Sequence, residues 1–306
     1  MPQYQNVLDS PNTNTIFMVW NFKENTTYKD AFKKLCTLVI NLNHSANTRF
    51  PKTQSSVILG ISYDAWIKLD LPKPLPKELK PFVAIKGEKH EAVSTKGDIH
   101  FHIRSTQQSY CVDIVSNLTD LLNDVATCQE EIHGFRYWDG RSILGFVDGT
   151  ENPQGDERIN FGLIGNEDSA YTNGSYLFVQ KYIHDMQAWK NLPISEQEKV
   201  IGRSKVDDIE MNDDEKPSNS HSALANVGDD KKIVRDNMPF GNMSTNEMGT
   251  YFIAYARKFS IVEEMLERMF VGEPAGNYDR ILDFSKAKTG TLFFVPSFDL
   301  LDQFSN

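Results

Sequence analysis

The sequence predicts an α+β protein made of two related halves, each a mainly antiparallel sheet with helices on one face. Stretches with strand-like and helix-like apolar spacing alternate along the chain, and their order is similar in its first and second parts. The length of 306 residues fits two domains or one large one. We therefore expect an N-terminal half over residues 1–155 and a C-terminal half over residues 156–306.

The first half opens with a strand-like run at residues 15–22, and a helix is expected over residues 28–42. The apolar residues of that helix recur at helical spacing, at Phe32, Leu35, Leu38, Val39 and Leu42. Residues 56–61 form a β-rich run and residues 98–104 alternate in character, so both are expected strands. Residues 111–128 carry apolar residues on one face, which predicts the second helix.

The second half shows a comparable order of elements. A first strand is expected directly after Asn173-Gly174, because this dipeptide marks a turn. The expected elements are strands at 175–183, 249–256 and 290–295, and helices at 196–202 and 261–270. This near-repetition is the reason for predicting two related halves.

One long polar segment, residues 205–237, interrupts the pattern. Loops beyond about 12–15 residues within a compact domain are usually functional or disordered. The segment contains His221 and Arg235, whereas its acidic part, residues 207–216, is interpreted as a solvated loop.

Composition and charge limit the classes of function. The net charge of −10 argues against a nucleic-acid binder, which needs a surplus of Lys and Arg. An odd number of cysteines without a CxxC pair favours a reducing compartment: Cys36, Cys111 and Cys128. The N-terminal residues show neither a secretion signal nor a twin-Arg motif, and no apolar run reaches the roughly 18 residues that span a bilayer. We expect a cytoplasmic protein without a membrane partner.

The strongest local signal for chemistry is residues 145–153, GFVDGTENP, in which Asp148 stands close to two glycines. Glycines allow a tight backbone path and the close approach of a flat ligand. On its own the Asp-Gly pair also fits an ordinary turn, and the spacing does not fit a calcium loop.

Other single residues are ambiguous when taken alone. His221 in SNSHSALANVG, Arg235 in IVRDNMPFG and Asp283 in YDRILDFS each also fit a surface role. His100 and His102 alternate on one strand face as half of a metal site would, but no third ligand follows at suitable spacing, so we interpret them as strand residues.

Taken in series, these segments resemble the dye-decolorising peroxidase family. The GxxDG signature is matched at residues 145–149, and SHSALAN matches the segment that carries the proximal histidine. IVRDNMPFG matches the segment of the distal arginine, and ILDF with GTLFFVPS matches the closing pattern at residues 281–284 and 290–297. The resemblance runs in order over most of the chain and is strongest after Gly134.

The resemblance implies two ferredoxin-like halves of the dimeric α/β-barrel type, with antiparallel sheets and helices packed outside. It implies a haem peroxidase that binds haem b, reduces hydrogen peroxide to water through a ferryl intermediate, and oxidises dyes, phenols or other small organic donors. The alternative is a haem-handling protein of the same fold with incidental peroxidase activity, which would not need a distal Asp148 and Arg235 pair.

The resemblance also implies roles for individual residues. His221 is the expected proximal iron ligand, and Asp283 is the preferred acceptor for its second ring nitrogen, with Asp279 as the competitor. Asp148 is the expected distal acid/base, and Arg235 is expected to stabilise charge as the O–O bond breaks. Asn237 is a distal polar neighbour, and Gly149 and Thr150 are expected beside the cofactor.

The electron donors and partners follow less directly from the sequence. Bulky dyes are expected to react at the surface through aromatic relays such as Tyr137, Trp138, Tyr251 and Tyr255, each of which also suits ordinary packing. A homodimer or higher homo-oligomer is expected. Because the chain ends at Asn306, shortly after the last strand, a docking tail for an encapsulin shell is doubtful.

Overall fold

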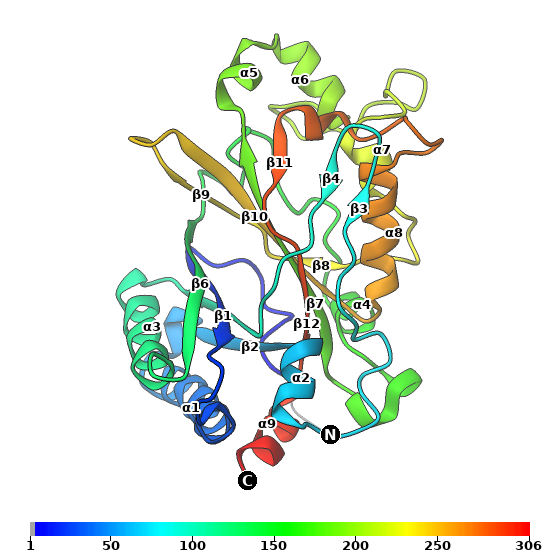
Figure 1. The fold of residues 1–306 in the computed structure, drawn as a ribbon. Helices are drawn as coiled ribbons and strands as arrows, with labels where there is room; N and C mark the ends of the chain where they lie inside the picture. Colours follow the sequence, from blue (N-terminus) through cyan, green and yellow to red (C-terminus); the bar gives the residue numbers. More distant parts are fainter. Residues whose placement is uncertain (1–3) are drawn as a thin grey trace.

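The computed structural model describes residues 4–306 and shows a single large antiparallel sheet wrapped into a barrel (Figure 1). Residues 1–3, which belong to the N-terminal segment considered for an export signal, lie outside the described residues. None of the helices in the described part is both long and apolar enough to cross a membrane.

The first half has a ferredoxin-like arrangement. Its strands and helices are β1 (Asn14–Phe22), α1 (Tyr28–Arg49), β2 (Ser56–Ser62), α2 (Tyr63–Leu69), β5 (Ile99–Ser105), α3 (Gln108–Leu122) and β6 (Ala126–Phe135). The 3-10 helix η1 (Pro51–Thr53) and the small hairpin β3 (Ile85–Lys86) and β4 (Glu91–Ala92) lie between them. The strands pair in the order β6-β1-β5-β2, all antiparallel, so the first strand lies between the last and the third.

The second half repeats this arrangement. It contains α4 (Glu157–Gly162), η2 (Asn166–Tyr171), β7 (Ser175–His184), α5 (Met186–Asn191), α6 (Ile194–Ile201), α7 (His221–Ala225), β8 (Val234–Arg235), β9 (Met238–Asn242), β10 (Glu247–Ala256), α8 (Phe259–Phe270), η3 (Arg280–Asp283), β11 (Ser285–Ala287), β12 (Thr291–Val295) and α9 (Phe298–Ser305). Its main strands pair in the order β12-β7-β10-β9, which is the same antiparallel order as in the first half. The duplication predicted from the sequence is confirmed.

The two halves close on each other through their outer strands. β12 pairs with β2 on one side, and β6 pairs with β9 on the other, where Gly134 lies opposite Phe240. Closure leaves the barrel strands without free edges, which removes a route to aggregation.

Alternation along the strands separates two apolar regions. On β1, Phe17 and Val19 point into the barrel, whereas Met18 and Trp20 face the helices outside. Helices α1 and α3 cover one part of the outer surface and α8 covers another (Figure 1). The barrel interior and the layer beneath the helices are therefore separate packing environments.

Two elements differ from the sequence-based expectation. The helix predicted over residues 111–128 ends at Leu122, and Cys128 belongs to strand β6. Strand β9 was not expected, because its Pro239 and Gly241 are typical of a turn. Both strands are stabilised by partners distant in the sequence, since β6 pairs with β1 and β9 with β10.

Candidate active site

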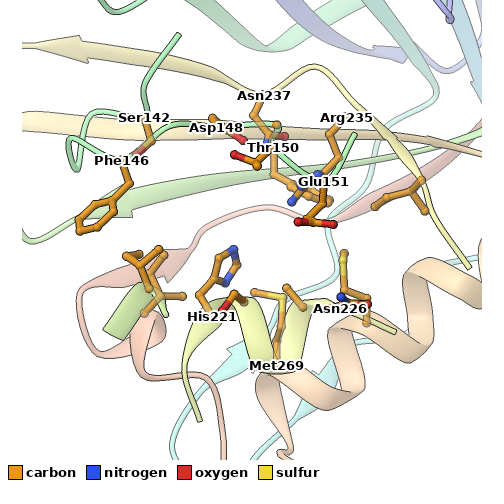
Figure 2. A pocket seen from close by; sticks show the side chains of 18 of the residues that line it. Ser142, Phe146, Asp148, Thr150, Glu151, His221, Asn226, Arg235, Asn237 and Met269 are labelled. Carbon is orange, nitrogen blue, oxygen red and sulfur yellow. Dashed lines mark hydrogen bonds between the residues drawn. The ribbon is translucent and has the colours of Figure 1, made fainter. Parts of the chain in front are cut away.

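A cavity lies on the outer face of β7 and β10, beneath α7 and α8, and residues 142, 144 and 146–151 also line it. Figure 2 shows Asp148, Thr150, Arg235 and Asn237 on one wall and His221 on the facing wall. Most other lining side chains are apolar: Leu144, Phe146, Val147, Ile201, Ala225, Val227, Ile233, Phe252, Ile261, Met265, Leu266, Met269 and Ile281. The cavity is therefore an apolar slot between a histidine and a polar group.

His221 is held by a buried carboxylate. It is the first residue of α7, and its ring Nδ1 lies 2.7 Å from Oδ2 of Asp279. Asp279 is 0% exposed, and its Oδ1 accepts a hydrogen bond of 3.0 Å from the backbone N–H of Ile281. A carboxylate so placed fixes the tautomer with the proton on Nδ1 and leaves Nε2 as a potential ligand.

The preference for Asp283 as the partner of His221 is wrong. Asp283 lies at the far end of η3 and accepts hydrogen bonds from Lys89 (2.5 Å) and Tyr278 (3.1 Å), with His90 Nε2 also 3.1 Å away. Burial raises the pKa of Asp283, but these hydrogen bonds outweigh it and lower the pKa below its ordinary value. Asp279 begins the same 3-10 turn, which directs its carboxylate towards α7 instead.

A second histidine lines the cavity but is not available as a ligand. His184 at the end of β7 has Nδ1 2.7 Å from the Ser285 hydroxyl and Nε2 2.9 Å from the Thr250 hydroxyl. Burial lowers its pKa to about 4, so the ring is neutral near pH 7. With both nitrogens engaged, His184 is a structural residue, and His221 is the cavity histidine that can bind a metal.

Asp148 is carried by the glycine-bounded loop of residues 145–149. Gly145 and Gly149 have positive φ angles of 93° and 81°, which favour glycine and explain the spacing of the motif. Asn237 Nδ2 donates a 3.2 Å hydrogen bond to Asp148 Oδ1, and Asn237 Oδ1 accepts from the N–H of Ile253. The amide of Asn237 thus positions the carboxylate against strand β10.

Arg235 reaches the same wall and is positioned by a residue that the sequence analysis did not single out. Asn152 accepts from the Arg235 backbone N–H and donates to its carbonyl, both at 2.7 Å. Asn152 belongs to the GFVDGTENP segment, so the family motif contained the signal. Within the described chain, no ion pair joins Arg235 to Asp148, although both line the cavity.

The acidic stretch at residues 207–216 is not only a solvated loop, which corrects the interpretation of the sequence. Asp208 accepts a 2.6 Å hydrogen bond from the Thr150 hydroxyl and forms a 2.8 Å ion pair with Arg203. Arg203 and Thr150 both line the cavity. The Thr150 hydroxyl therefore ties the segment of residues 145–153 to residues 203–208 at the edge of the cavity.

The residues present fit a haem. A porphyrin needs a flat apolar slot, one neutral imidazole on the iron and a polar face for the incoming oxidant. The cavity offers these features. Lys232 and Arg235 line it and form no ion pair among residues 4–306, so they are available to the carboxylates of a porphyrin. A bare metal ion is less suited, because no group of three His, Cys, Asp or Glu side chains converges anywhere in the described part.

Comparison with known families agrees with this site. The model described as Dyp-type peroxidase, N-terminal, matches residues 5–136, and that described as Dyp-type peroxidase, C-terminal, matches residues 139–300. A dye-decolorizing peroxidase of Rhodococcus erythropolis (strain PR4 / NBRC 100887) is 46% identical over 291 residues, which are 94% of this chain and 84% of the relative.

Solved structures are similar over almost the whole chain. A dye-decolorizing peroxidase from Bacteroides thetaiotaomicron VPI-5482 has a TM-score of 0.97 and 51% identity, and the match covers 100% of this chain and 99% of that one. A variant of DypB from Rhodococcus jostii RHA1 in complex with heme has a TM-score of 0.91 and 43% identity over 97% of each chain. The encapsulated DyP-type peroxidase from Mycobacterium smegmatis has a TM-score of 0.94 and 44% identity, covering 99% and 98%. Because both family models match and the relatives align from end to end, this chain belongs to the Dyp-type peroxidase family.

Proposed function

We propose that the protein binds haem b through His221, reduces hydrogen peroxide to water at the opposite face, and oxidises dyes, phenols or other small organic donors. One observation supports this proposal most strongly. His221, which is hydrogen-bonded to Asp279, lies across an apolar cavity from Asp148, Asn237 and Arg235. A haem carrier has no need of the distal acid and arginine. When bound, the haem would supply the iron that takes the peroxide, and it would pass the oxidising equivalents of the peroxide on to the donors.

On the proximal side, the Asp279 carboxylate holds the proton of His221 on Nδ1. The hydrogen bond of 2.7 Å to a fully buried anion makes the imidazole a stronger electron donor than a free histidine. Asp279 in turn keeps its orientation through the Ile281 N–H. The pair therefore acts as one anchored ligand.

On the distal side, Asp148 moves the proton. Its carboxylate accepts a proton from the inner oxygen of hydrogen peroxide and returns it to the outer oxygen, which then leaves as water. Asn237 donates to Oδ1, which leaves Oδ2 as the atom for the proton transfer. Arg235 supplies the positive charge that stabilises the outer oxygen as the O–O bond lengthens.

Bulky donors are expected to react at the surface near Trp138, which is 78% exposed. Tyr137 and Trp138 line a shallow cleft with Asp139, Arg141 and Gly145, and their rings are 6.1 Å apart. The cleft is joined to the distal loop, because the Asp148 N–H donates to the carbonyl of Gly140. An exposed aromatic ring suits flat aromatic donors, which can stack on it.

Location and assembly are further parts of the proposal. Cys36, Cys111 and Cys128 are free thiols, which supports a reducing, cytoplasmic setting. The proposal also includes the predicted homodimer or higher homo-oligomer, which the mass of the protein in solution would test. An encapsulated relative exists, so residence of this protein in a shell is testable by coexpression with an encapsulin. The division of the chain into an N-terminal half over residues 1–155 and a C-terminal half over residues 156–306 stays a prediction.

Absorption spectra of the haem-loaded protein, before and after stoichiometric peroxide, test the assignment. The wild type should show a Soret band that changes with peroxide, and His221→Ala should lose or shift that band. His184→Gln is the matched control, because it alters the other cavity histidine and should keep the wild-type ligand spectrum. A Soret band that does not respond to peroxide would instead support the haem-handling alternative.

A further inference from the structure

The barrel interior contains a polar and aromatic cluster that the proposed site does not use. Tyr255, Tyr251, His102 and His100 are each 0% exposed, and Arg104 is 1% exposed. Phe17 stacks between Tyr251 and His102, with ring centroids 4.2 and 4.9 Å away. Histidine and arginine are rarely buried this completely without a role in pairing or chemistry.

One hydrogen bond in this cluster joins a phenol to a base. The Tyr255 hydroxyl and His102 Nδ1 are 2.8 Å apart. Burial, together with the charge of Arg104, lowers the pKa of His102 well below its ordinary value, so the ring is neutral and Nδ1 can accept. Its Nε2 then carries the proton and lies 3.5 Å from Oδ2 of Asp236. Asp236 forms a 2.6 Å ion pair with Arg104, and both are buried.

This cluster lies directly behind the cavity. Arg235 and Asn237 line the cavity, whereas the side chain of Asp236 between them is buried beside His102. On β10, Thr250 and Phe252 line the cavity and Tyr255 points to the opposite face, where it lies opposite Val234 of β8. The backbone of a single layer of strands thus separates Tyr255 from the cavity.

Tyr251 provides a natural comparison within the same cluster. It is on the same strand and is as deeply buried, but its hydroxyl has no hydrogen-bond partner among the described residues. A tyrosine that loses an electron becomes a strong acid, and a positive charge trapped in an apolar interior is costly. Oxidation is therefore favourable only where a base can take the phenolic proton.

We propose that Tyr255 is a redox-active residue, which gives one electron to the peroxide-oxidised active site and transfers its phenolic proton to Nδ1 of His102. The inference rests on the proposed function, because hydrogen peroxide supplies the oxidising equivalents. In this step the O–H bond of Tyr255 breaks and an N–H bond forms on His102, while the active site is reduced by one electron. The products are a neutral tyrosyl radical and an imidazolium, which Asp236 stabilises from the side of Nε2.

The burial of Tyr255 and His102 indicates what the redox step does for the enzyme. Tyr255 is inaccessible to external donors, so it serves as a reservoir that takes up an oxidising equivalent when no donor is present. A surface tyrosine would instead exchange electrons directly with dyes. Without donor, the first one-electron reduction of the peroxide-oxidised active site should therefore be faster with Tyr255 than without it.

Freeze-quench electron paramagnetic resonance of the haem-loaded protein after one equivalent of peroxide tests the proposal. The protein is prepared with and without ring-deuterated tyrosine, so that a tyrosyl signal is identified by its narrowing. The wild type and Tyr251→Phe should both give this signal, and Tyr255→Phe should lose most of it. His102→Gln, which keeps a hydrogen-bonding group but removes the base, should lose the signal as well.

Several outcomes would overturn the proposal. A tyrosyl signal of unchanged yield in Tyr255→Phe would do so, and so would its loss in Tyr251→Phe alone. If His102→Gln does not fold, the pair Tyr255→Phe and Tyr251→Phe still decides the result. A peroxide-induced spectral change without any tyrosyl signal refutes this inference alone, whereas a haem spectrum that is unresponsive to peroxide refutes the proposed function and this inference with it.

Discussion

Replacing Asp279 with asparagine should weaken haem binding, and the structure explains how. The two carboxylate oxygens of Asp279 accept from two different donors, the His221 ring and the Ile281 N–H. Asparagine has the same shape but offers one oxygen and one NH2 group. The NH2 group would then face one of these two N–H donors, unless His221 moves its proton from Nδ1 to Nε2. A proton on Nε2 blocks the atom that should bind iron.

The magnitude follows from the charge and burial of the hydrogen bond. A hydrogen bond to a charged group contributes about 1.5–3 kcal/mol, and leaving a buried donor unpaired costs a similar amount. With about 1.4 kcal/mol for each factor of ten, we expect Asp279→Asn to bind haem ~10–100-fold more weakly. Titration of the haem-free protein with haem, followed at the Soret band, measures this directly.

Asp283→Asn is the matched control for this experiment. The residue is four positions further along, at the other end of η3, and its carboxylate contacts Lys89, His90 and Tyr278 rather than His221. Its haem affinity should equal that of the wild type. If Asp283→Asn weakens haem binding as much as Asp279→Asn does, the assignment of Asp279 as the partner of the proximal ligand is refuted.

Three further predictions concern the distal wall and the buried histidines. Arg235→Leu should slow the reaction with peroxide in stopped-flow spectra by ~100-fold or more, and by more than Asp148→Asn does; the reverse order would contradict the ranking. Asn152→Ala removes both hydrogen bonds to the Arg235 backbone, so it should lower the free energy of unfolding by about 1–3 kcal/mol and slow the same reaction, whereas an unchanged rate would show that Arg235 is held by other contacts. Burial lowers the pKa of His184 to about 4 in the folded protein, whereas the unfolded state keeps the ordinary value of 6.5. As the pH falls below 6.5, the histidine is therefore protonated in the unfolded state before it is protonated in the folded state, and this favours unfolding. Protonation of His184 should lower the free energy of unfolding by about 1.4 kcal/mol per pH unit between pH 6.5 and 4. Denaturant titrations at several pH values should therefore show that the free energy of unfolding falls less steeply with decreasing pH in His184→Gln than in the wild type.

The sequence predicted the elements whose pattern is local. Helical spacing identified α1 and α8, and alternation identified β5, because a single apolar face suffices for those predictions. Strand β6 was missed because its sequence, ATCQEEIHGF, contains few β-branched residues and follows an apolar helix without a strong turn signal. Its pairing with β1 and β9 depends on residues far away in the chain, which no local pattern reports.

The same limit applies to the candidate site. The motif identified Asp148, His221 and Arg235 as a set, and the structure places them around one cavity. The choice between Asp279 and Asp283 depended on the direction of a 3-10 turn, which the sequence pattern does not determine. Likewise, the alternation of His100 and His102 places them on one strand face, and only closure of the barrel buries that face completely.

The distal wall and the barrel interior share one short segment, and this links the catalytic proposal to the redox proposal. Arg235, Asp236 and Asn237 are consecutive, yet the outer two line the cavity while Asp236 pairs with Arg104 inside the barrel. The backbone of the segment is fixed from both sides, since Asn152 holds Arg235 and the Asp236 N–H donates to the carbonyl of Ile253. The buried ion pair therefore acts as an anchor for the two distal side chains. Because the same carboxylate faces His102, the group that helps to position the peroxide-binding wall also stabilises the proton released by Tyr255.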